Sequence, residues 1–440
     1  MLYITNGYLI DPKSGLEGVR NILINEGRIA CIAPAECSLA EIIEQSGLKV
    51  DEKEVDQIGQ INAAGKIVAP GLVDVHVHFR DPGFTYKEDI ESGAAAAARG
   101  GFTSVVLMAN TKPAVDNVET LKYVLEKGQK TDINVYSCAN VTVGMKGKEL
   151  SDMETLSRMG AAGFTDDGIP ILDEELLRMA LRKAAELNKP VSLHEENPEY
   201  ITNNGINAGK AAAHFGIGGS PREAEISMVE RDIKIAVEEE ADLSIQHIST
   251  KEAVELVRRA KRHSCHIFAE ATPHHFTLTE EAAIKHGTLA KMNPPLREEE
   301  DRMAIIEGLK DGTIDMIATD HAPHSSEEKA KPITEAPSGI IGLETALSLG
   351  IRELVIPGHL TMMQLMEKMS LAPAGLYHLD AGYIAEGAPA DIIIFDKDAE
   401  WIAGNFVSKS GNSPFIGQRM PGVIEYTICG GKIVFENPEK

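Results

Sequence analysis

Two histidines spaced two residues apart, His76 and His78, end an apolar stretch of the chain. Successive side chains of a strand point to opposite faces, so both imidazoles project the same way and can bind one metal ion. Alternating histidines also occur on solvated strand faces, but the apolar lead-in at 67–72, with its Pro-Gly pair, favours a buried strand. Arg80 follows on a turn. The sequence therefore predicts a metal site with a cation beside it.

The elements that would position these residues are short β-branched runs that alternate with helical patterns from residue 73 onward. Eight such units predict an α/β fold, a (β/α)8 TIM-like barrel, in which the chemistry lies at the C-terminal ends of the strands. The expected strands are 73–77, 103–108, 133–139, 161–164, 190–193, 242–246, 265–269 and 315–318. The expected helices include 87–99, 173–188, 221–239 and 250–262.

Carboxylates and histidines recur at the ends of four later strands. Asp166 and Asp167 follow the fourth strand, His194 the fifth, His247 the sixth and Asp320 the eighth. A single buried histidine is usually a hydrogen-bonded core residue, and a single aspartate after a strand usually caps a helix. Such groups at strand end after strand end favour metal binding instead. Imidazole and carboxylate ligands without thiolates suit zinc, and Mn, Co and Fe share these ligand types.

Four histidines and two aspartates are too many ligands for one ion, whereas two ions ~3.5–4 Å apart that share a carboxylate and a hydroxide use them all. We therefore predict a two-metal site. The expected ligands are His76, His78 and Asp320 for one ion and His194 and His247 for the other. Asp167 would bridge the two ions. Asp166 is the competing bridge, and spacing alone leaves that choice open.

The composition is that of an ordinary globular chain of 440 residues, with 43% hydrophobic and 25% charged residues. No apolar run reaches the ~20 residues of a membrane span and no leader pattern follows Met1, so we expect a cytoplasmic protein. Five cysteines without C-x-x-C spacing predict packing residues rather than disulfides or a zinc ribbon. A net charge of −24 argues against nucleic acid and anionic membranes as partners. An anionic substrate would need a local cationic pocket.

Both ends of the chain have the pattern of strands and turns. Residues 2–33 and 389–436 alternate in strand-like runs, with hairpin signals at 25–28 and 429–432. We expect residues 1–61 and 389–440 to pair into one small composite β domain, and residues 62–388 to form the barrel. Residues 34–60 are polar, Glu-rich and weakly helical, and we assign them no function.

Five motifs together resemble the dihydroorotase family of the amidohydrolase superfamily: D-V-H-V-H-F-R-D-P-G, M-A-N-T-K-P, F-T-D-D-G, K-M-N-P-P-L-R and A-T-D-H-A-P-H. Many relatives, including hydantoinases, bridge their metals with a carboxylated lysine. The fourth-strand motif has no lysine, which resembles the branch that bridges with aspartate, and this resemblance implies Asp167 as the bridge. The chain departs from the family pattern at Ala109, in place of a proline, and at Ser338, in place of a larger apolar residue.

The resemblance implies reversible hydrolysis of (S)-dihydroorotate to N-carbamoyl-L-aspartate, a step of de novo pyrimidine biosynthesis, by a metal-activated hydroxide. Asp320 is expected to carry the proton from the hydroxide to the departing amide nitrogen. The planar guanidinium of Arg80 suits the substrate carboxylate. The other expected substrate contacts are His78, Asn110, Asn293, His324, Ser338 and Gly339.

Two alternatives remain open. Another cyclic amidohydrolase, such as a hydantoinase, dihydropyrimidinase or allantoinase, would use the same chemistry, but Arg80 and the missing lysine argue against it. A catalytically silent scaffold that binds a partner enzyme should have lost ligands, and all six are present. We expect a small-molecule substrate, two zinc ions per subunit and a homodimer, and we consider association with aspartate transcarbamoylase.

Overall fold

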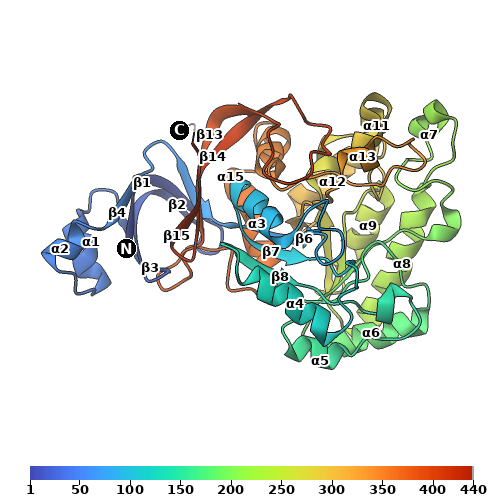
Figure 1. The fold of residues 1–440 in the computed structure, drawn as a ribbon, viewed down its shortest axis with the longest axis horizontal. Helices are drawn as coiled ribbons and strands as arrows, with labels where there is room; N and C mark the ends of the chain where they lie inside the picture. Colours follow the sequence, from blue (N-terminus) through green and yellow to red (C-terminus); the bar gives the residue numbers. More distant parts are fainter. Residues whose placement is uncertain (439–440) are drawn as a thin grey trace.

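Short runs of buried, mostly apolar residues form the wall of a parallel barrel in the computed structural model, which describes residues 1–438 (Figure 1). Such runs suit strands that are covered on both faces. The barrel strands are β6 (Leu72–Val77), β7 (Phe102–Leu107), β8 (Asn134–Ser137), β9 (Val191–Leu193), β10 (Leu243–Ile245), β11 (Ile267–Ala271) and β12 (Met316–Ile317). The order β6-β7-β8 and the order β9-β10-β11-β12 are parallel throughout.

Single bridges close the barrel between these two groups of strands. Phe164 pairs with Ala139 on one side and with Val191 on the other, and Val77 pairs with His321. The predicted strand 161–164 is therefore reduced to Phe164, because the chain turns away at once through the bends that carry Asp166 and Asp167. The predicted strand 265–269 lies two residues later, at Ile267–Ala271.

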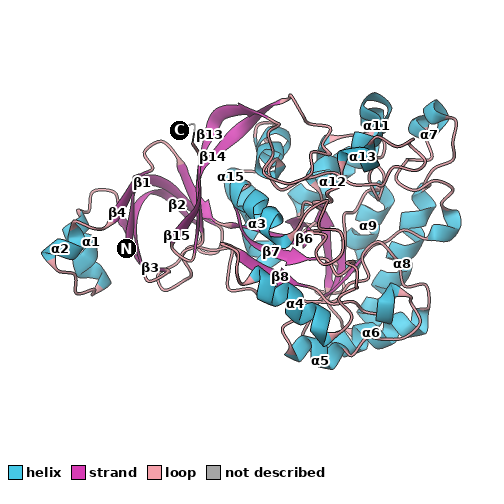
Figure 2. Ribbon diagram, in the orientation of Figure 1, coloured by secondary structure: helices cyan, strands magenta, loops and turns pink. Residues whose placement is uncertain are grey.

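Helices surround the barrel strands (Figure 2). The longer ones are α3 (Ile90–Arg99), α4 (Val118–Gly128), α6 (Glu174–Glu186), α8 (Arg222–Glu239), α9 (Lys251–Ala260) and α12 (Glu299–Asp311). Shorter α-helices are α1 (Leu39–Ser46), α2 (Glu52–Val55), α5 (Met153–Arg158), α7 (Lys210–Phe215), α10 (Pro273–Thr277), α11 (Glu280–His286), α13 (Ser326–Lys329), α14 (Ala346–Gly350), α15 (Met362–Met366) and α16 (Ala372–Leu376). The 3-10 turns are η1 (Val143–Met145), η2 (Pro198–Tyr200) and η3 (Gly287–Ala290), and η4 (Ile351–Val355) and η5 (Glu367–Leu371) are π-helical.

A second sheet joins the two ends of the chain, in the order β15-β14-β13-β5-β1-β2-β3, with β4 paired to β1. Both termini lie in this part of the molecule (Figure 1). Its strands are β1 (Leu2–Asp11), β2 (Leu16–Asn25), β3 (Arg28–Pro34), β4 (Gly59–Asn62), β5 (Ile67–Pro70), β13 (Ile392–Ile402), β14 (Arg419–Cys429) and β15 (Lys432–Glu436). The prediction of a (β/α)8 barrel with a small β domain from both termini is confirmed.

The domain boundaries at residues 61/62 and 388/389 stay a prediction, and strand β5 lies close to the first of them. This strand lies within the range 62–388 expected for the barrel, yet it pairs with β1 and β13 of the terminal sheet. Ala69 and Ile393, from β5 and β13, belong to the same buried apolar cluster as the barrel residue Leu72. The terminal sheet and the barrel therefore share part of one core.

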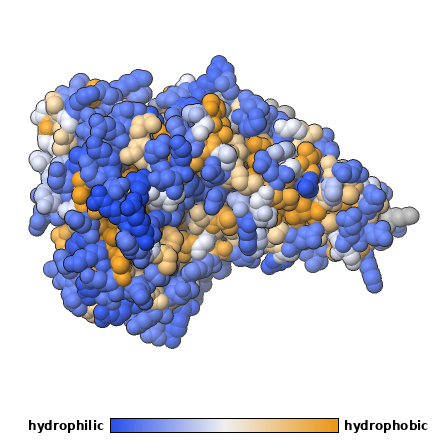
Figure 3. Space-filling view, turned by 180° about the vertical axis from the view of Figure 1, so that it is seen from behind, coloured by the Kyte–Doolittle hydropathy of each residue, from blue (hydrophilic) through white to orange (hydrophobic). Residues whose placement is uncertain are grey.

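The surface of the molecule is mostly polar, with apolar patches near the narrow end that holds the terminal sheet (Figure 3). None of the helices in residues 1–438 has the length and apolar composition needed to traverse a bilayer. All five cysteines are free thiols; Cys265 is exposed rather than packed in the core, because it precedes β11.

Candidate metal and substrate site

Six buried side chains converge at the C-terminal ends of the barrel strands. They form three overlapping groups whose nitrogen and oxygen atoms lie within 4.8 Å of one another. The groups are His76, His78 and Asp167; His76, His247 and Asp320; and Asp167, His194 and His247. The structure thus brings together all six ligands that the sequence predicted.

Asp167 lies at the centre of this cluster. Its Oδ1 atom is 3.5 Å from Nε2 of His76, 4.0 Å from Nδ1 of His194 and 3.8 Å from Nε2 of His247. Its Oδ2 atom is 3.5 Å from Nε2 of His78. Both carboxylate oxygens thus face imidazole nitrogens that come from different strands, which is the arrangement that a bridging ligand requires.

Asp320 lies on the other side of the first histidine pair. Its Oδ1 atom is 2.9 Å from Nε2 of His78 and 3.5 Å from Nε2 of His76. Burial opposes ionisation of this carboxyl, but the neighbouring His76 and His78 outweigh it and hold its pKa well below the usual value. Asp320 is therefore a carboxylate that can bind a cation or accept a proton.

The chemistry of these atoms fits metal ions. Nε2 of His76 is buried and has no hydrogen-bond partner among the described residues, although it faces two carboxylates. Nδ1 of His194 and Nε2 of His247 lie 3.0 Å apart. Two imidazole nitrogens and several carboxylate oxygens gathered in a buried space are the usual ligands of zinc and related cations.

Asp166 and Asp167 occupy different surroundings although they are adjacent. Asp166 Oδ1 accepts hydrogen bonds from the backbone N–H groups of Val141, at 2.9 Å, and Thr142, at 3.2 Å. It also accepts one from the Asn140 amide, at 3.2 Å, and its Oδ2 is bonded to the Thr142 hydroxyl. Asp166 thus anchors the loop after β8, which leaves Asp167 to face the histidines.

Two glutamates that the sequence analysis missed contact the outer nitrogens of the histidines. Glu270 Oε2, in β11, is 3.1 Å from Nδ1 of His76, and Glu196 Oε2 is 3.2 Å from Nε2 of His194. Carboxylates in this position fix the ring orientation and tautomer of a metal-binding histidine. Burial alone would lower the pKa of His76, but Glu270 and the two aspartates raise it well above the usual value. The one sequence signal that could have identified Glu270 was its position on the seventh barrel strand.

Arg80 and His324, both expected to bind substrate, lie beside the cluster. Nη2 of Arg80 is 3.4 Å from Nε2 of His324, and Nε of Arg80 donates to the Pro323 carbonyl at 3.3 Å. Nε2 of His324 is 2.8 Å from the Ser338 carbonyl, so it carries the proton, and Nδ1 is free to accept from Lys87 Nζ at 3.3 Å. Burial, and then Arg80 and Lys87, hold the pKa of His324 far below the usual value.

The remaining predicted contacts surround the same space. The Asn110 amide donates to Asp167 Oδ2 at 2.9 Å, and its oxygen is 3.0 Å from Nδ1 of His78, so Asn110 links the two ligands. Asn293 Oδ1 is buried and unpaired in the described structure. A Cβ atom on Gly205 would lie 2.9 Å from that oxygen and 2.2 Å from Ser338 Oγ. The loop after β9 thus covers this part of the site.

Gly339 has a left-handed backbone with φ of 150°. A Cβ atom there would lie 2.7 Å from the His324 ring and 2.6 Å from the Ala322 carbonyl. Glycine is therefore required for the close approach of this segment to His324. Asn412, which the sequence analysis also missed, holds both: its amide donates to the Gly339 carbonyl, and its oxygen accepts from the His324 N–H, each at 3.0 Å.

Comparison with known proteins agrees with this geometry. The sequence pattern of the Amidohydrolase family matches residues 67–434. The chain is 54% identical over 436 residues to the dihydroorotase of Clostridioides difficile (strain 630), covering 99% of this chain and 100% of that one. It is 48% identical over 439 residues to the dihydroorotase of Clostridium acetobutylicum, with the same coverage.

Solved structures with the same fold include the L-hydantoinase (dihydropyrimidinase) from Arthrobacter aurescens, with a TM-score of 0.85 at 24% identity over 99% of this chain and 96% of that one. The dihydropyrimidinase from Brevibacillus agri NCHU1002 has a TM-score of 0.82 at 22% identity, over 99% and 95% of the two chains. At these identities the similarity concerns the fold. The family pattern and the close relatives together show that this chain belongs to the dihydroorotases of the amidohydrolase family.

Proposed function

We propose that this protein catalyses the reversible hydrolysis of (S)-dihydroorotate to N-carbamoyl-L-aspartate, a step of pyrimidine biosynthesis. The 54% identity to a dihydroorotase over 99% of the chain supports this activity. The observation that carries it in the structure is the pairing of a six-ligand cluster with Arg80 and His324 on one side of it. A cyclic amide that bears a carboxylate would use both halves of such a site.

The cofactor that we propose is a pair of zinc ions. His76, His78 and Asp320 would hold one ion, His194 and His247 the other, and Asp167 would bridge them. Bound ions of this kind lower the pKa of a water molecule and polarise an amide carbonyl. Asn110 supports the bridge, since its amide contacts both Asp167 and His78.

In the reaction that we propose, Asp320 moves the proton. Its carboxylate is buried, ionised and 2.9 Å from His78, so it can accept a proton from the attacking water and return it to the departing ring nitrogen. The ring amide gains one water molecule overall. The C–N bond breaks, the carbonyl carbon takes up the water oxygen, and one water proton passes through Asp320 to the ring nitrogen. The other proton is released when the new carboxylic acid ionises to a carboxylate.

Substrate recognition would fall to the polar groups around Arg80. Its guanidinium would pair with the substrate carboxylate in a charged, two-pronged hydrogen bond. Asn110 and His324 would complete that contact, Asn293 would bind the ring edge, and Ser338 and Gly339 would contact the ring through the backbone. The unpaired oxygen of Asn293 supports its role, since a buried amide oxygen calls for a donor.

A direct assay tests this function. Purified protein is given dihydroorotate, hydantoin, dihydrouracil and allantoin in turn, and its metal content is measured by elemental analysis in the same preparation. We expect hydrolysis of dihydroorotate to exceed that of the neutral rings by at least about tenfold in kcat/KM, and about two zinc ions per chain. Faster turnover of hydantoin or dihydrouracil would assign the chain to another cyclic amidohydrolase, and no turnover of any ring would favour the silent scaffold.

We propose a cytoplasmic homodimer whose composite β domain spans 1–61 and 389–440, with the barrel over 62–388. Light scattering after gel filtration measures the oligomeric state. The same column, run with aspartate transcarbamoylase present, tests whether the two enzymes associate.

A further inference from the structure

Two buried lysines lie beside the substrate pocket without a carboxylate partner. Lys291 follows η3 and is the first residue of the motif that contains Asn293, and Lys329 ends α13; each is 5% exposed. Among residues 1–438, neither ammonium nitrogen forms an ion pair within 4.0 Å. Burying an unpaired ammonium group is unfavourable, so its retention calls for a specific set of acceptors.

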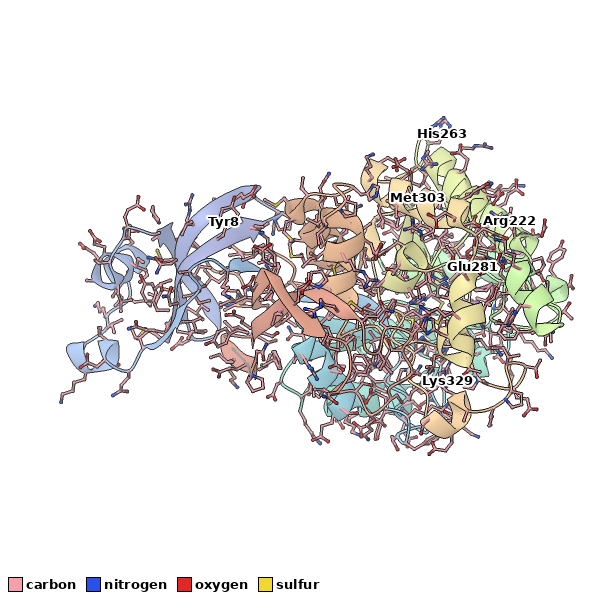
Figure 4. The ribbon with its side chains drawn as sticks, turned by 90° about the horizontal axis from the view of Figure 1, so that it is seen from above. Tyr8, Arg222, His263, Glu281, Met303 and Lys329 are labelled. Carbon is pink, nitrogen blue, oxygen red and sulfur yellow. The ribbon has the colours of Figure 1, made fainter. Side chains whose placement is uncertain are left out.

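Those acceptors are backbone carbonyls of residues 333–339. Lys291 Nζ donates to the carbonyls of Ile333 at 2.8 Å and Ala336 at 2.7 Å. Lys329 Nζ donates to the carbonyls of Pro337 at 2.9 Å and Gly339 at 3.0 Å. The two side chains thus bind four carbonyls of one seven-residue segment. Figure 4 shows Lys329 in the barrel part of the molecule, far from Tyr8 of the terminal sheet.

The segment forms no strand or long helix. Its backbone–backbone contacts are a turn at Pro332 and the bond from the Gly339 N–H to the Lys291 carbonyl, at 2.9 Å. Besides the two lysines, the side chains that bond to its carbonyls are His324, at Ser338, and Asn412, at Gly339. Ile333 packs on an apolar cluster with Ile206 of the loop after β9. The lysines therefore act as internal cross-links in place of a sheet.

What the segment presents to the site is the carbonyl of Ser338 and the backbone of Gly339. The Ser338 carbonyl fixes the proton-bearing nitrogen of His324, which in turn lies 3.4 Å from Arg80. Burial, and then Lys291, lower the pKa of Lys329 to about 7. A neutral amine still has two N–H bonds, enough for both carbonyls, so this contact persists in either protonation state.

We propose that Lys291 and Lys329 are positioning residues, which hold residues 333–339 in the shape that places His324 and the Gly339 backbone against the substrate. This inference rests on the proposed function, because it concerns how the same pocket binds the carboxylate of dihydroorotate. In the described structure, the ammonium groups bond to backbone carbonyls and to none of the six expected metal ligands, so the lysines should affect substrate binding far more than the chemical step.

The test compares Lys329→Met and Lys291→Met with Lys331→Met, which removes an exposed lysine two residues from Lys329. Methionine keeps most of the side-chain volume and removes the donors. In each of the first two variants we expect KM for dihydroorotate to rise at least about tenfold, kcat to change less than about threefold, and bound metal to equal that of the parent. Lys331→Met should match the parent in all three.

The proposal would be overturned if kcat fell while KM stayed unchanged, or if the variants lost metal. It would also be overturned if KM of Lys329→Met and Lys291→Met stayed within twofold of that of Lys331→Met. If Lys329→Met shows no thermal unfolding transition and is therefore not folded, the comparison of Lys291→Met with Lys331→Met decides. A parent protein that does not hydrolyse dihydroorotate would instead refute the proposed function. The calorimetric affinity of each variant for N-carbamoyl-L-aspartate should fall by the same factor as KM rises.

Discussion

Asp166 and Asp167 are adjacent in the sequence but have different partners in the structure. Asp166 accepts hydrogen bonds from Val141 and Thr142, so its charge is used within the loop after β8. Asp167 receives one side-chain donor, Asn110, and faces four histidines. Two adjacent carboxylates that look equivalent in the sequence thus differ in the structure: Asp166 anchors a loop, and Asp167 faces the histidines.

The first prediction concerns this pair. Asp167→Ala removes the carboxylate that would join two ions, so bound zinc should fall to well under half of the parent value. Asp166→Ala is the matched control and should retain most of its metal, although the loop after β8 loses a partner. Elemental analysis after dialysis measures both; a lower metal content in the Asp166 variant would reverse the assignment of the bridge.

A second prediction concerns Asp320. Replacing a positioned proton carrier costs ~10²–10⁴-fold in rate. Asp320→Asn keeps the shape of the side chain and one oxygen, so kcat for dihydroorotate should fall by that factor while most of the metal stays bound. Steady-state kinetics and metal analysis on one preparation are sufficient. Near-parental turnover would exclude Asp320 from proton transfer.

A third prediction concerns Arg80. Charged hydrogen bonds are worth about 1.5–3 kcal/mol, so Arg80→Ala should reduce kcat/KM for dihydroorotate at least about tenfold. Dihydrouracil has no carboxylate and serves as the control: its hydrolysis, where measurable, should hardly change. Equal losses for both rings would mean that Arg80 supports the architecture of the site rather than the substrate.

The convergence of the six expected ligands could be predicted from the sequence, because these residues lie at or just after strand ends at recognisable spacings. Glu196 and Asn412 could not. Glutamate is frequent in a chain with 67 acidic residues, so the contact of Glu196 with His194 has no pattern of its own. Asn412 lies in an irregular segment 88 residues after His324, and such a contact depends on tertiary structure alone.

At the scale of elements, periodicity gave the strands and capping residues set the helix ends. Helix α3 begins at Ile90 rather than at the predicted residue 87, because Asp89 is its N-cap: the Asp89 side chain accepts from the Ser92 N–H at 2.8 Å. The fourth strand was predicted too long, since only Phe164 pairs on both sides before the chain bends. Local sequence patterns predict that an element exists, whereas its length depends on the strand pairing and capping that neighbouring residues provide.

The N-cap of α3 also links this helix to the C-terminal part of the chain. Burial alone would raise the pKa of Asp89, but the Lys409 ammonium group and the Ser92 N–H lower it to about 2. A folded pKa below the unfolded value of 3.8 stabilises the protein above about pH 4, and this contribution is lost as the pH falls through about 2.

A fourth prediction follows for Asp89→Asn, which keeps a capping oxygen and removes the charge. The shift corresponds to ~2 kcal/mol, and after solvent screening we expect unfolding free energy about 1 kcal/mol below the parent near neutral pH. The difference should shrink between about pH 4 and pH 2. Chemical denaturation of both proteins without metal measures it. A difference that stays constant with pH would mean that the negative charge of Asp89 contributes nothing to stability.

Over the whole molecule the net charge is negative, but positively charged side chains gather at the substrate pocket. The chain carries −24, yet Arg80, Lys87 and Lys329 gather around His324. Lys87 is also paired with Glu328 at 2.9 Å, whereas the half-buried Arg80 has no ion pair within 4.0 Å among residues 1–438. An anion that reaches this pocket is thus attracted locally by a protein that repels it at a distance.

The C-terminal segment that joins β13 to β14 completes the same pocket. Phe415 belongs to the apolar core of the barrel, and beside it the buried Asn412 side chain holds three backbone groups. It donates to the carbonyls of Ala322 and Gly339 and accepts from the N–H of His324, all at 3.0 Å. The strand pairing that unites both chain ends therefore also delivers a residue to the site.

The last prediction tests this coupling between the whole fold and the pocket. Asn412→Ala leaves the backbone N–H of His324 and the carbonyl of Ala322 without partners, at a cost of about 1–3 kcal/mol each, and leaves the Gly339 carbonyl with Lys329 as its donor. We expect Tm to fall and KM for dihydroorotate to rise at least about fivefold, because the His324 backbone and the Gly339 carbonyl lose their common anchor. Ser413→Ala is the matched control: Ser413 is equally buried, but its hydroxyl accepts only the nearby Phe415 N–H, at 3.2 Å. That variant should lose some stability and keep the parental KM. If both variants lower Tm and neither changes KM, the C-terminal segment stabilises the barrel without shaping the substrate pocket.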